Sequence, residues 1–292
     1  MLFRSPVALY LPFFKVKYPT DSSRQITILD LLNHSSGLRD AKTDLIRWVH
    51  HDGEPMVNQT EMIKSVLPKY AKLVFEPGSQ TKYTNIGYMV LAAIIEQASG
   101  QDYEDYIRQN ILFPLGMNRT DFVYTPAMEA NEAAGSHPLF DVVSLLIPFT
   151  VRSYVRETYK KQVYFKRFYT DQSSPSGLFG PVSDLALFIL AYLNNGQLHG
   201  NQVLSTKLIN KMTYTGFRNM PANSLDDFSK KGIGWMVNRK SGRLLLSHMG
   251  NGIGFNTSLL ILPEEKLGFV AFCNSTKFNA WQITDLAASL KW

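Results

Sequence analysis

The spacing of apolar residues changes once along this chain, and that change restricts the fold more than any other feature. Before about residue 210 apolar residues recur at helical spacing, as in the buried pattern Tyr88–Gly100 that a glycine closes. After about residue 230 they form short strand-like runs, separated by turn residues such as Lys240-Ser-Gly242. The predicted elements are helices over 102–112 and Leu185–Leu193, strands over Ile233–Asn238, Arg243–Ser247, Asn256–Leu262 and Leu267–Asn274, and a terminal helix over Phe278–Leu290. This order predicts an α+β fold with a helical region, an antiparallel sheet and a closing helix.

Composition excludes several classes of protein. The 292 residues include one cysteine, Cys273, so no intrachain disulfide is possible, and its apolar surroundings predict a buried strand residue. The six histidines have no metal-ligand spacing, so we predict no metal site. The net charge of +6 is spread along the chain, except in Arg152–Arg167, and therefore predicts no nucleic-acid partner.

The apolar beginning of the chain has only a superficial likeness to a secretion signal. Pro6 and Pro12 interrupt it, and no small-residue cleavage site precedes Lys15. No apolar run reaches the length of a membrane span. We expect a soluble chain, and the sequence leaves its compartment and its oligomeric state open.

The most specific motifs lie in five segments that follow one another in a fixed order. They are Pro6-Val-x-x-Tyr-Leu-Pro12 with Ile26-Thr-Ile-x-x-Leu-Leu-Asn-His-Ser-Ser-Gly-Leu38, Phe75-Glu-Pro-Gly-Ser-x-x-x-Tyr-Thr-Asn85, Pro114-Leu-Gly-Met-Asn-x-Thr120, Gly177-Leu-Phe-Gly-Pro-Val-Ser-Asp-Leu185 and Ser247-His-Met-Gly-Asn-Gly-Ile-Gly-Phe255. Within the first segment, Thr27 and Asp30 form a predicted capping box at a helix start. Together the segments resemble the class C β-lactamase and esterase group of the serine β-lactamase and penicillin-binding-protein superfamily.

The resemblance implies a β-lactamase/DD-peptidase-like fold, in which a helical domain faces an antiparallel sheet flanked by helices. It divides the chain into a remnant of the N-terminal part of the α/β region (1–25), a helical domain (26–212), and the sheet with the C-terminal helix (213–292). The stretch from about 129 to 172 departs from the family pattern and is expected to be an atypical insertion.

The same resemblance implies acyl transfer through a serine ester, with an ester, amide or peptide as substrate and no cofactor. In the family the nucleophile lies in a helical Ser-x-x-Lys turn upstream of the Pro6–Pro12 segment. The one Ser-x-x-Lys of this chain, Ser79-Gln-Thr-Lys82, sits in a turn directly before Tyr83, so we reject Ser79 as the nucleophile.

We therefore expect the N-terminal strands and the nucleophile helix to be missing from this chain. The sheet is then expected to have an unpaired edge that lowers stability or pairs with another chain, and residues 1–292 alone are expected to be inactive. The alternatives are a non-catalytic binding or scaffold protein of the same fold and a truncated product without function.

Tyr83 and Asn85 correspond to the second catalytic motif of the family, Tyr-x-Asn. A phenol has an ordinary pKa of about 10, so without the family's lysine nearby Tyr83 is expected to be a neutral hydrogen-bonding group. Tyr192-Leu-Asn194 has the same pattern, but it lies at a predicted helix end. A tyrosine at a strand edge is the structural alternative for Tyr83.

His248-Met-Gly250 occupies the place of the family's Lys-Thr-Gly motif. Because histidine is charged only part of the time near neutrality, it holds a β-lactam carboxylate less well than lysine does, which favours the esterase, amidase or peptidase branches. His51-Asp-Gly53 has the same pattern without a preceding apolar strand. By the resemblance, Gly250 allows close approach of the substrate, and the Asn251 N–H is one oxyanion donor.

The insertion combines an apolar stretch, Leu139–Phe149, with the basic residues that follow it, Arg152, Arg156, Lys160, Lys161, Lys166 and Arg167. This combination suits a lid over the cleft or contact with an anionic membrane surface through about 139–167. An insertion that only packs on the helical domain explains the same residues equally well.

Overall fold

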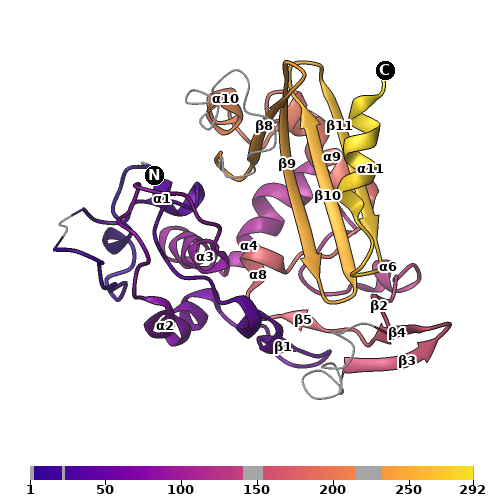
Figure 1. Ribbon diagram of the computed structural model, residues 1–292, viewed down its shortest axis with the longest axis horizontal. Helices are drawn as coiled ribbons and strands as arrows, with labels where there is room; N and C mark the ends of the chain where they lie inside the picture. Colours follow the sequence, from indigo (N-terminus) through magenta and orange to yellow (C-terminus); the bar gives the residue numbers. More distant parts are fainter. Residues whose placement is uncertain (1–2, 22–23, 141–153, 215–231, 292) are drawn as a thin grey trace.

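The computed structural model describes residues 3–21, 24–140, 154–214 and 232–291. Figure 1 shows a mainly helical region on one side and a four-stranded sheet with its helices on the other. The predicted α+β class is confirmed. Among the described residues, no helix has the length and apolar character needed to cross a membrane.

The sheet consists of β8 (Met236–Lys240), β9 (Arg243–Gly252), β10 (Phe255–Leu262) and β11 (Leu267–Cys273), in the order β11-β10-β9-β8. All neighbouring pairs are antiparallel. All four predicted strands are present, but β8 begins at Met236 rather than Ile233, and β9 continues past Ser247 to Gly252. Pairing of these residues with β10 overrides the weak strand preference of glycine.

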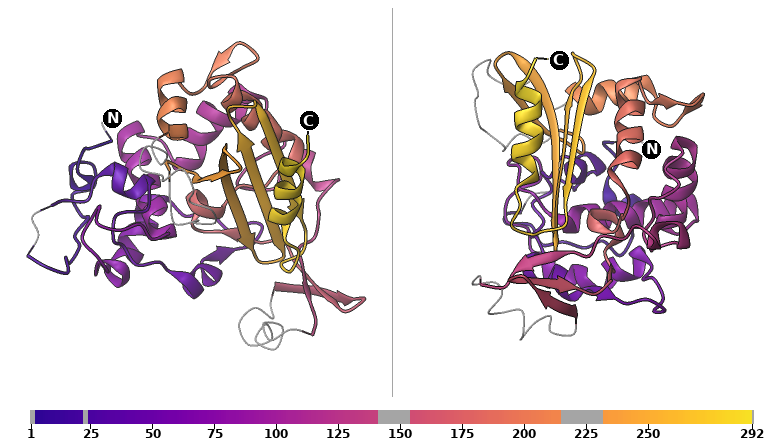
Figure 2. Two further views of the ribbon diagram at one scale, coloured as in Figure 1. Left: turned by 45° about the horizontal axis from the view of Figure 1, so that its top comes forward. Right: turned by 90° about the vertical axis from the view of Figure 1, so that its right-hand side faces the viewer.

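Helices cover both faces of this sheet (Figure 2). Alternate residues of β9 point to opposite faces, so Leu244 and Leu246 pack towards α9 (Val182–Leu193), whereas Leu245 packs towards α11 (Ala280–Ser289). Helix α9 begins three residues earlier than predicted because Pro181 occupies the N-cap position, where its fixed backbone suits a helix entry. Cys273 ends β11 and is partly rather than fully buried.

The helical region surrounds α3 (Asn85–Ser99), which packs against α1 (Ile28–Leu32) and α2 (Gln59–Tyr70). Their apolar side chains form one buried cluster, and Val7 of η1 (Val7–Leu9) belongs to it. The predicted capping box of α1 is present, and Gly100 closes α3 in the left-handed conformation with φ of 71°. The proposed domain boundaries stay a prediction.

The remaining helices are mostly short. They are η2 (Lys42–Arg47), α4 (Tyr103–Ile107), η3 (Arg108–Leu112), α5 (Phe113–Leu115), α6 (Pro126–Glu129), α8 (Ser173–Ser176) and α10 (Thr206–Tyr214). Two small ladders pair β1 (Val49–His50) with β5 (Tyr169–Thr170) and β6 (Gln197–Leu198) with β7 (Asn201–Gln202).

The predicted insertion contains a separate sheet, ordered β2 (Ser136–Pro138), β4 (Gln162–Phe165) and β3 (Val155–Tyr159). The β3–β4 hairpin projects from the rest of the chain (Figures 1 and 2). Its buried side chains pack with Ile253, in the turn between β9 and β10, while Tyr154 of the insertion stacks on His51 of the helical region. Residues 141–153 lie outside the described residues, so the lid and the membrane contact stay predictions.

Candidate active site

Tyr83 and Asn85 lie where an extended segment enters α3. Asp40 holds this entry: its Oδ1 accepts the backbone N–H of Asn85 at 2.8 Å and the Asn85 amide at 3.3 Å. A carboxylate that accepts the first amide of a helix also suits the positive end of the helix dipole. The Tyr83 hydroxyl donates to the Asn85 Oδ1 at 3.5 Å, so the structure brings the two predicted residues together.

The surroundings of Tyr83 favour a neutral phenol. Burial raises the pKa of Tyr83, and the nearby negative charge of Asp40 raises it further. The side chain is nevertheless 36% exposed, so one part of the ring remains accessible. A protonated hydroxyl at this place can donate a hydrogen bond or pass a proton on, but it is not a ready base.

A buried histidine packs directly behind Tyr83. The ring of His34 lies 4.3 Å from that of Tyr83 and 5.1 Å from that of Tyr88, measured between centroids. The His34 Nδ1 accepts the backbone N–H of Thr84 at 3.3 Å. Sequence reasoning missed His34, Asp40 and Tyr88 as parts of this site; the one available signal was the place of His34 in the His34-Ser-Ser-Gly37 motif.

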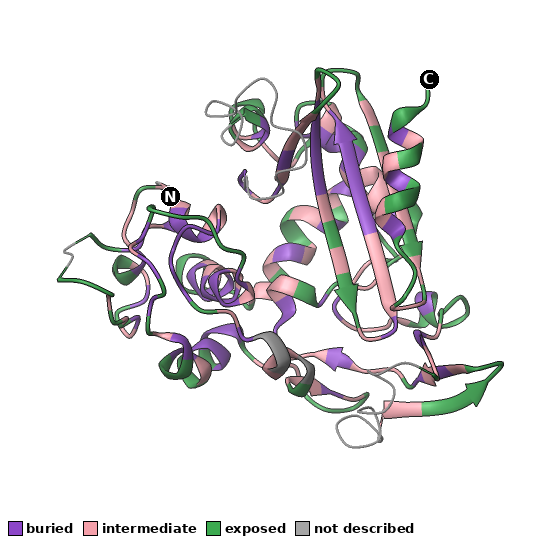
Figure 3. Ribbon diagram, in the orientation of Figure 1, coloured by how far each residue is buried: buried purple, intermediate pink, exposed green. Residues whose placement is uncertain are grey.

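The second group of predicted residues, His248, Gly250 and Asn251, lies in the last half of β9, where the strand passes from buried to exposed (Figure 3). His248 is half-buried and pairs with Leu259 of β10. Strand alternation places its side chain on the same face as Leu246, towards α9. A Cβ on Gly250 would lie 2.3 Å from the Thr257 Oγ1, so glycine allows β10 to pass close by.

The strand register indicates where the backbone of β9 points. In an antiparallel ladder, hydrogen-bonded pairs alternate with non-hydrogen-bonded pairs. Two-residue turns follow Lys240 and Gly252, and the closing pairs of these hairpins are Lys240↔Arg243 and Gly252↔Phe255. These closing pairs are of the hydrogen-bonded kind. Counting along β9 in steps of two residues from either pair gives the same result: the N–H of Asn251 points away from β10, towards the β8 side.

Strand β8 does not reach that part of β9. Its first residue, Met236, pairs with Ser247. In the described part of the chain, no strand pairs with β9 on this side beyond Ser247. The backbone N–H of Asn251 is therefore directed to an edge that the described strands leave open, and Asn251 itself is exposed.

The two groups belong to different regions, and Tyr88 of α3 connects these regions. Its hydroxyl donates to the Leu32 carbonyl at 3.0 Å. Burial raises the pKa of Tyr88, while a backbone hydrogen bond from Gly234, two residues before β8, acts in the opposite direction. The Tyr88 hydroxyl is thus bonded to the end of α1, and it lies close to the segment that leads into the sheet.

The other segments of the chain that match the motif patterns lie outside these two groups of predicted residues. Tyr192 is buried on α9, where its hydroxyl bonds to the Thr213 hydroxyl at 2.9 Å. His51 follows the two-residue strand β1, and its ring stacks on Tyr154. Ser79 lies in a turn and donates to the Glu76 carbonyl at 2.7 Å, outside any helix. The rejection of Ser79 agrees with this geometry.

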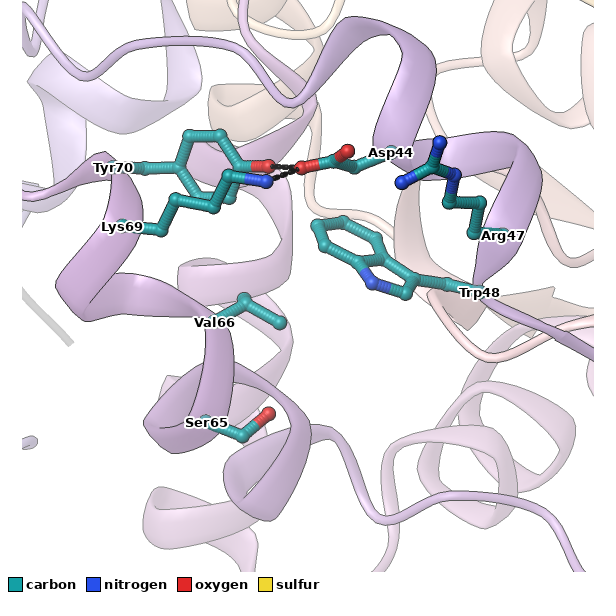
Figure 4. Close-up of a pocket in the computed structure, with 7 residues that line it drawn as sticks. All are labelled: Asp44, Arg47, Trp48, Ser65, Val66, Lys69 and Tyr70. Atoms are coloured by element: carbon teal, nitrogen blue, oxygen red, sulfur yellow. Dashed lines mark hydrogen bonds and ion pairs between the residues drawn. The ribbon is translucent and has the colours of Figure 1, made fainter.

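A pocket of about 270 Å³ opens between η2 and α2, and no predicted site residue lines it. Figure 4 shows Asp44 reaching from η2 to Lys69 and Tyr70 of α2, with Trp48 beside them. The hydrogen bonds from Lys69 and Tyr70 lower the pKa of Asp44. These groups satisfy one another, which is typical of a structural contact. The described residues contain no cluster of metal-ligating side chains.

Comparison with known proteins identifies the family of this chain. The family model described as Beta-lactamase matches residues 3–289. The chain is 31% identical over 235 residues to the mouse protein "Serine beta-lactamase-like protein LACTB, mitochondrial", covering 73% of the chain and 38% of that protein. It is 26% identical over 242 residues to a "Putative D-alanyl-D-alanine carboxypeptidase" of Escherichia coli K12, covering 80% of the chain and 52% of that protein.

Solved structures share the fold. A class C beta-lactamase superposes with a TM-score of 0.68 at 18% identity, covering 100% of this chain and 76% of that one. The octameric penicillin-binding protein homologue from Pyrococcus abyssi gives 0.70 at 24% identity, covering 99% and 60%. The chain thus spans 38% and 52% of the two curated relatives named above.

Proposed function

We propose that this chain, which belongs to the Beta-lactamase family, carries the tyrosine and the oxyanion strand of a serine hydrolase that acts by acyl transfer. The observation that carries the proposal is the combination of two groups. A neutral tyrosine hydroxyl is held at the start of α3, and a backbone N–H is directed to the open edge of β9. Acyl transfer needs a proton-transferring group and an oxyanion donor of these kinds.

The reaction assigns a role to each group. A serine hydroxyl attacks the carbonyl carbon of the substrate, its proton passes through the family's lysine and Tyr83 to the leaving group, and the Asn251 N–H stabilises the oxyanion. Expulsion of the leaving alcohol or amine gives the acyl-serine ester, which water then hydrolyses. The Asn85 side chain, hydrogen-bonded to the Tyr83 hydroxyl, orients that hydroxyl. The family's Ser-x-x-Lys is not represented on a helix within residues 1–292, where Ser79 heads the one such sequence.

The substrate class follows from β9. His248 replaces a permanently charged lysine, so a fixed carboxylate on the substrate is held less firmly. The end of β9, which no described strand covers on the β8 side, presents backbone groups that pair with an amide or peptide. These features favour a small-molecule or peptide ester or amide over a β-lactam. Similar proteins include one named as a putative carboxypeptidase and a D-amino acid amidase.

A second candidate function is supported by Ser79. Because the single Ser-x-x-Lys lies in a turn, residues 1–292 by themselves suit a non-catalytic binding or scaffold protein that keeps the substrate cleft of the fold. The two functions differ in one property, since only the hydrolase forms a covalent bond to an acyl donor.

Covalent labelling with a fluorophosphonate probe tests the proposal. We expect no labelling of residues 1–292, and stoichiometric labelling of any form of the protein that also contains a helical Ser-x-x-Lys. Absence of labelling, and of ester or amide hydrolysis, in such a form would favour the binding function. Labelling of residues 1–292 that disappears in Ser79→Ala would show that Ser79 is the nucleophile and contradict our assignment.

A further inference from the structure

His34 combines features that a packing residue does not need. It is buried, with 6% of its surface exposed, and its backbone has a φ of 59°. Left-handed backbone is uncommon for residues other than glycine, although asparagine, aspartate and histidine adopt it more often than most. Such conformations persist where surrounding contacts impose them, and they gather at functional sites.

Three contacts of His34 lead to the segment that carries Tyr83. Its carbonyl accepts the N–H of Lys82 at 2.9 Å, and its Nδ1 accepts the N–H of Thr84 at 3.3 Å. One residue therefore holds the backbone on both sides of Tyr83. Its ring also covers the Tyr83 ring at a centroid distance of 4.3 Å.

The left-handed backbone explains how one residue makes these contacts. The helix α1 ends at Leu32, and the chain reverses through His34 to run beside residues 74–84. In this reversal the carbonyl and the ring of His34 both reach the Lys82–Thr84 segment, while the ring also packs on Tyr88 of α3. Removal of the ring leaves the main-chain contact to Lys82 in place, so the two kinds of contact are separable.

We propose that His34 is the positioning residue of Tyr83, holding the phenol with its ring and the Tyr83–Asn85 backbone with its Nδ1. This positioning role rests on the proposed function, in which Tyr83 transfers protons. His34 itself is assigned no contact with substrate. It acts by limiting where the Tyr83 hydroxyl lies.

Two variants separate the two contacts. His34→Asn keeps a hydrogen-bond acceptor near the Nδ1 position and tolerates the left-handed backbone, but it lacks the ring. His34→Phe keeps a ring and lacks the acceptor. His199→Asn is the matched control, because His199 also has a positive φ, 50°, but is exposed in the turn between β6 and β7.

The readouts are the pKa of Tyr83, measured by NMR of ring-labelled tyrosine with Tyr83→Phe for assignment, and the exchange rate of the Thr84 amide. In His34→Asn we expect the pKa of Tyr83 to fall towards its ordinary value of about 10, because the covering ring is gone. In His34→Phe we expect the Thr84 amide to exchange about tenfold faster or more, because its acceptor is gone. A role in overall stability alone would lower the melting temperature of both variants, leave the pKa of Tyr83 unchanged, and speed exchange of the Thr84 amide no more than that of other buried amides.

Wild-type values of both readouts in both variants would overturn the proposal. In a form that contains a helical Ser-x-x-Lys, the proposal also predicts a loss of roughly 10- to 100-fold in the acylation rate for His34→Asn, with little change in non-covalent affinity. The expected NMR changes, together with absence of labelling in such a form, would contradict the proposed function and support the positioning role. Unchanged NMR readouts contradict the positioning role whether or not labelling occurs.

Discussion

The two halves of the candidate site hold their functional groups in different ways. At the start of α3 the proposed functional groups are side chains: the His34 ring packs on Tyr83, and Asp40 accepts the backbone N–H of Asn85. At the end of β9 the proposed group is the backbone N–H of Asn251, and the ladder to β10 directs it. The first half is therefore sensitive to side-chain chemistry, and the second is sensitive only to changes that remove the amide or disturb the register.

The two regions also differ in how they are stabilised. The helical region buries carboxylates such as Glu96, which accepts backbone N–H groups at the start of α2, and Glu104, which accepts the side-chain amide of Gln59. The sheet is covered on both faces by apolar clusters around Leu246 and Leu260. Buried polar groups are costly to leave unpaired, so single substitutions in the helical region test specific hydrogen bonds rather than cavity size.

The largest effect is expected for Tyr83→Phe in a form that contains a helical Ser-x-x-Lys. Removing the hydroxyl takes away the proposed proton transfer, which is worth about 10²- to 10⁴-fold in rate. We expect the acylation rate to fall by about 10³-fold while the thermal stability stays close to that of the wild type. A loss below about tenfold, measured by stopped-flow labelling, would remove Tyr83 from the mechanism.

The second largest effect on the rate is expected at Asn251, where two substitutions are compared. Proline removes the backbone N–H, and loss of one oxyanion donor costs about 10²- to 10³-fold in rate. Alanine keeps the N–H, so Asn251→Ala should retain activity within a few-fold. Equal losses in the two variants would show that the side chain of Asn251 is the functional group, and the distinction between the two halves would fail.

The third prediction concerns stability alone. Glu96 accepts the backbone N–H groups of Gln59 at 3.0 Å and Thr60 at 2.7 Å, at the beginning of α2. Glu96→Ala leaves these buried donors unpaired, at about 1–3 kcal/mol each, so we expect a loss of about 3 kcal/mol in urea unfolding. Glu61→Ala, in the exposed first turn of the same helix, is the control and should change the free energy of unfolding by less than about 0.5 kcal/mol.

The smallest effect depends on pH. Burial raises the pKa of Glu104, and the hydrogen bond from Ser173 opposes this. A carboxyl with a raised folded-state pKa makes the protein less stable as pH rises through the unfolded value, about 4.3, towards the folded one. Glu104→Gln removes the charge, so we expect it to be more stable than the wild type at pH 7, by less than about 1 kcal/mol. An equal gain at pH 4 and pH 7 would show that the buried charge of Glu104 is not the cause.

The sequence predicted much of this fold because its signals are local. The capping box of α1, the glycine that closes α3 and the four strands of the sheet each depend on neighbouring residues. The motifs also located Tyr83, Asn85 and the His248–Asn251 segment. Their roles in catalysis stay predictions.

Long-range contacts explain what the sequence could not predict. His34 lies far along the chain from Thr84. The hydrogen bond between them requires a left-handed backbone at His34, which no sequence pattern predicts. The same is true of the hydrogen bond between Tyr88 and Gly234. The direction of the Asn251 N–H depends on the register of two hairpins, which a residue pattern leaves undefined.

Mapping of the fluorophosphonate adduct by peptide mass spectrometry tests the central claim most directly. We expect no adduct on residues 1–292, and, in any form that also contains a helical Ser-x-x-Lys, one adduct on that serine, which Tyr83→Phe should form more slowly. An adduct on Ser79, or on any other residue of 1–292, would contradict the account.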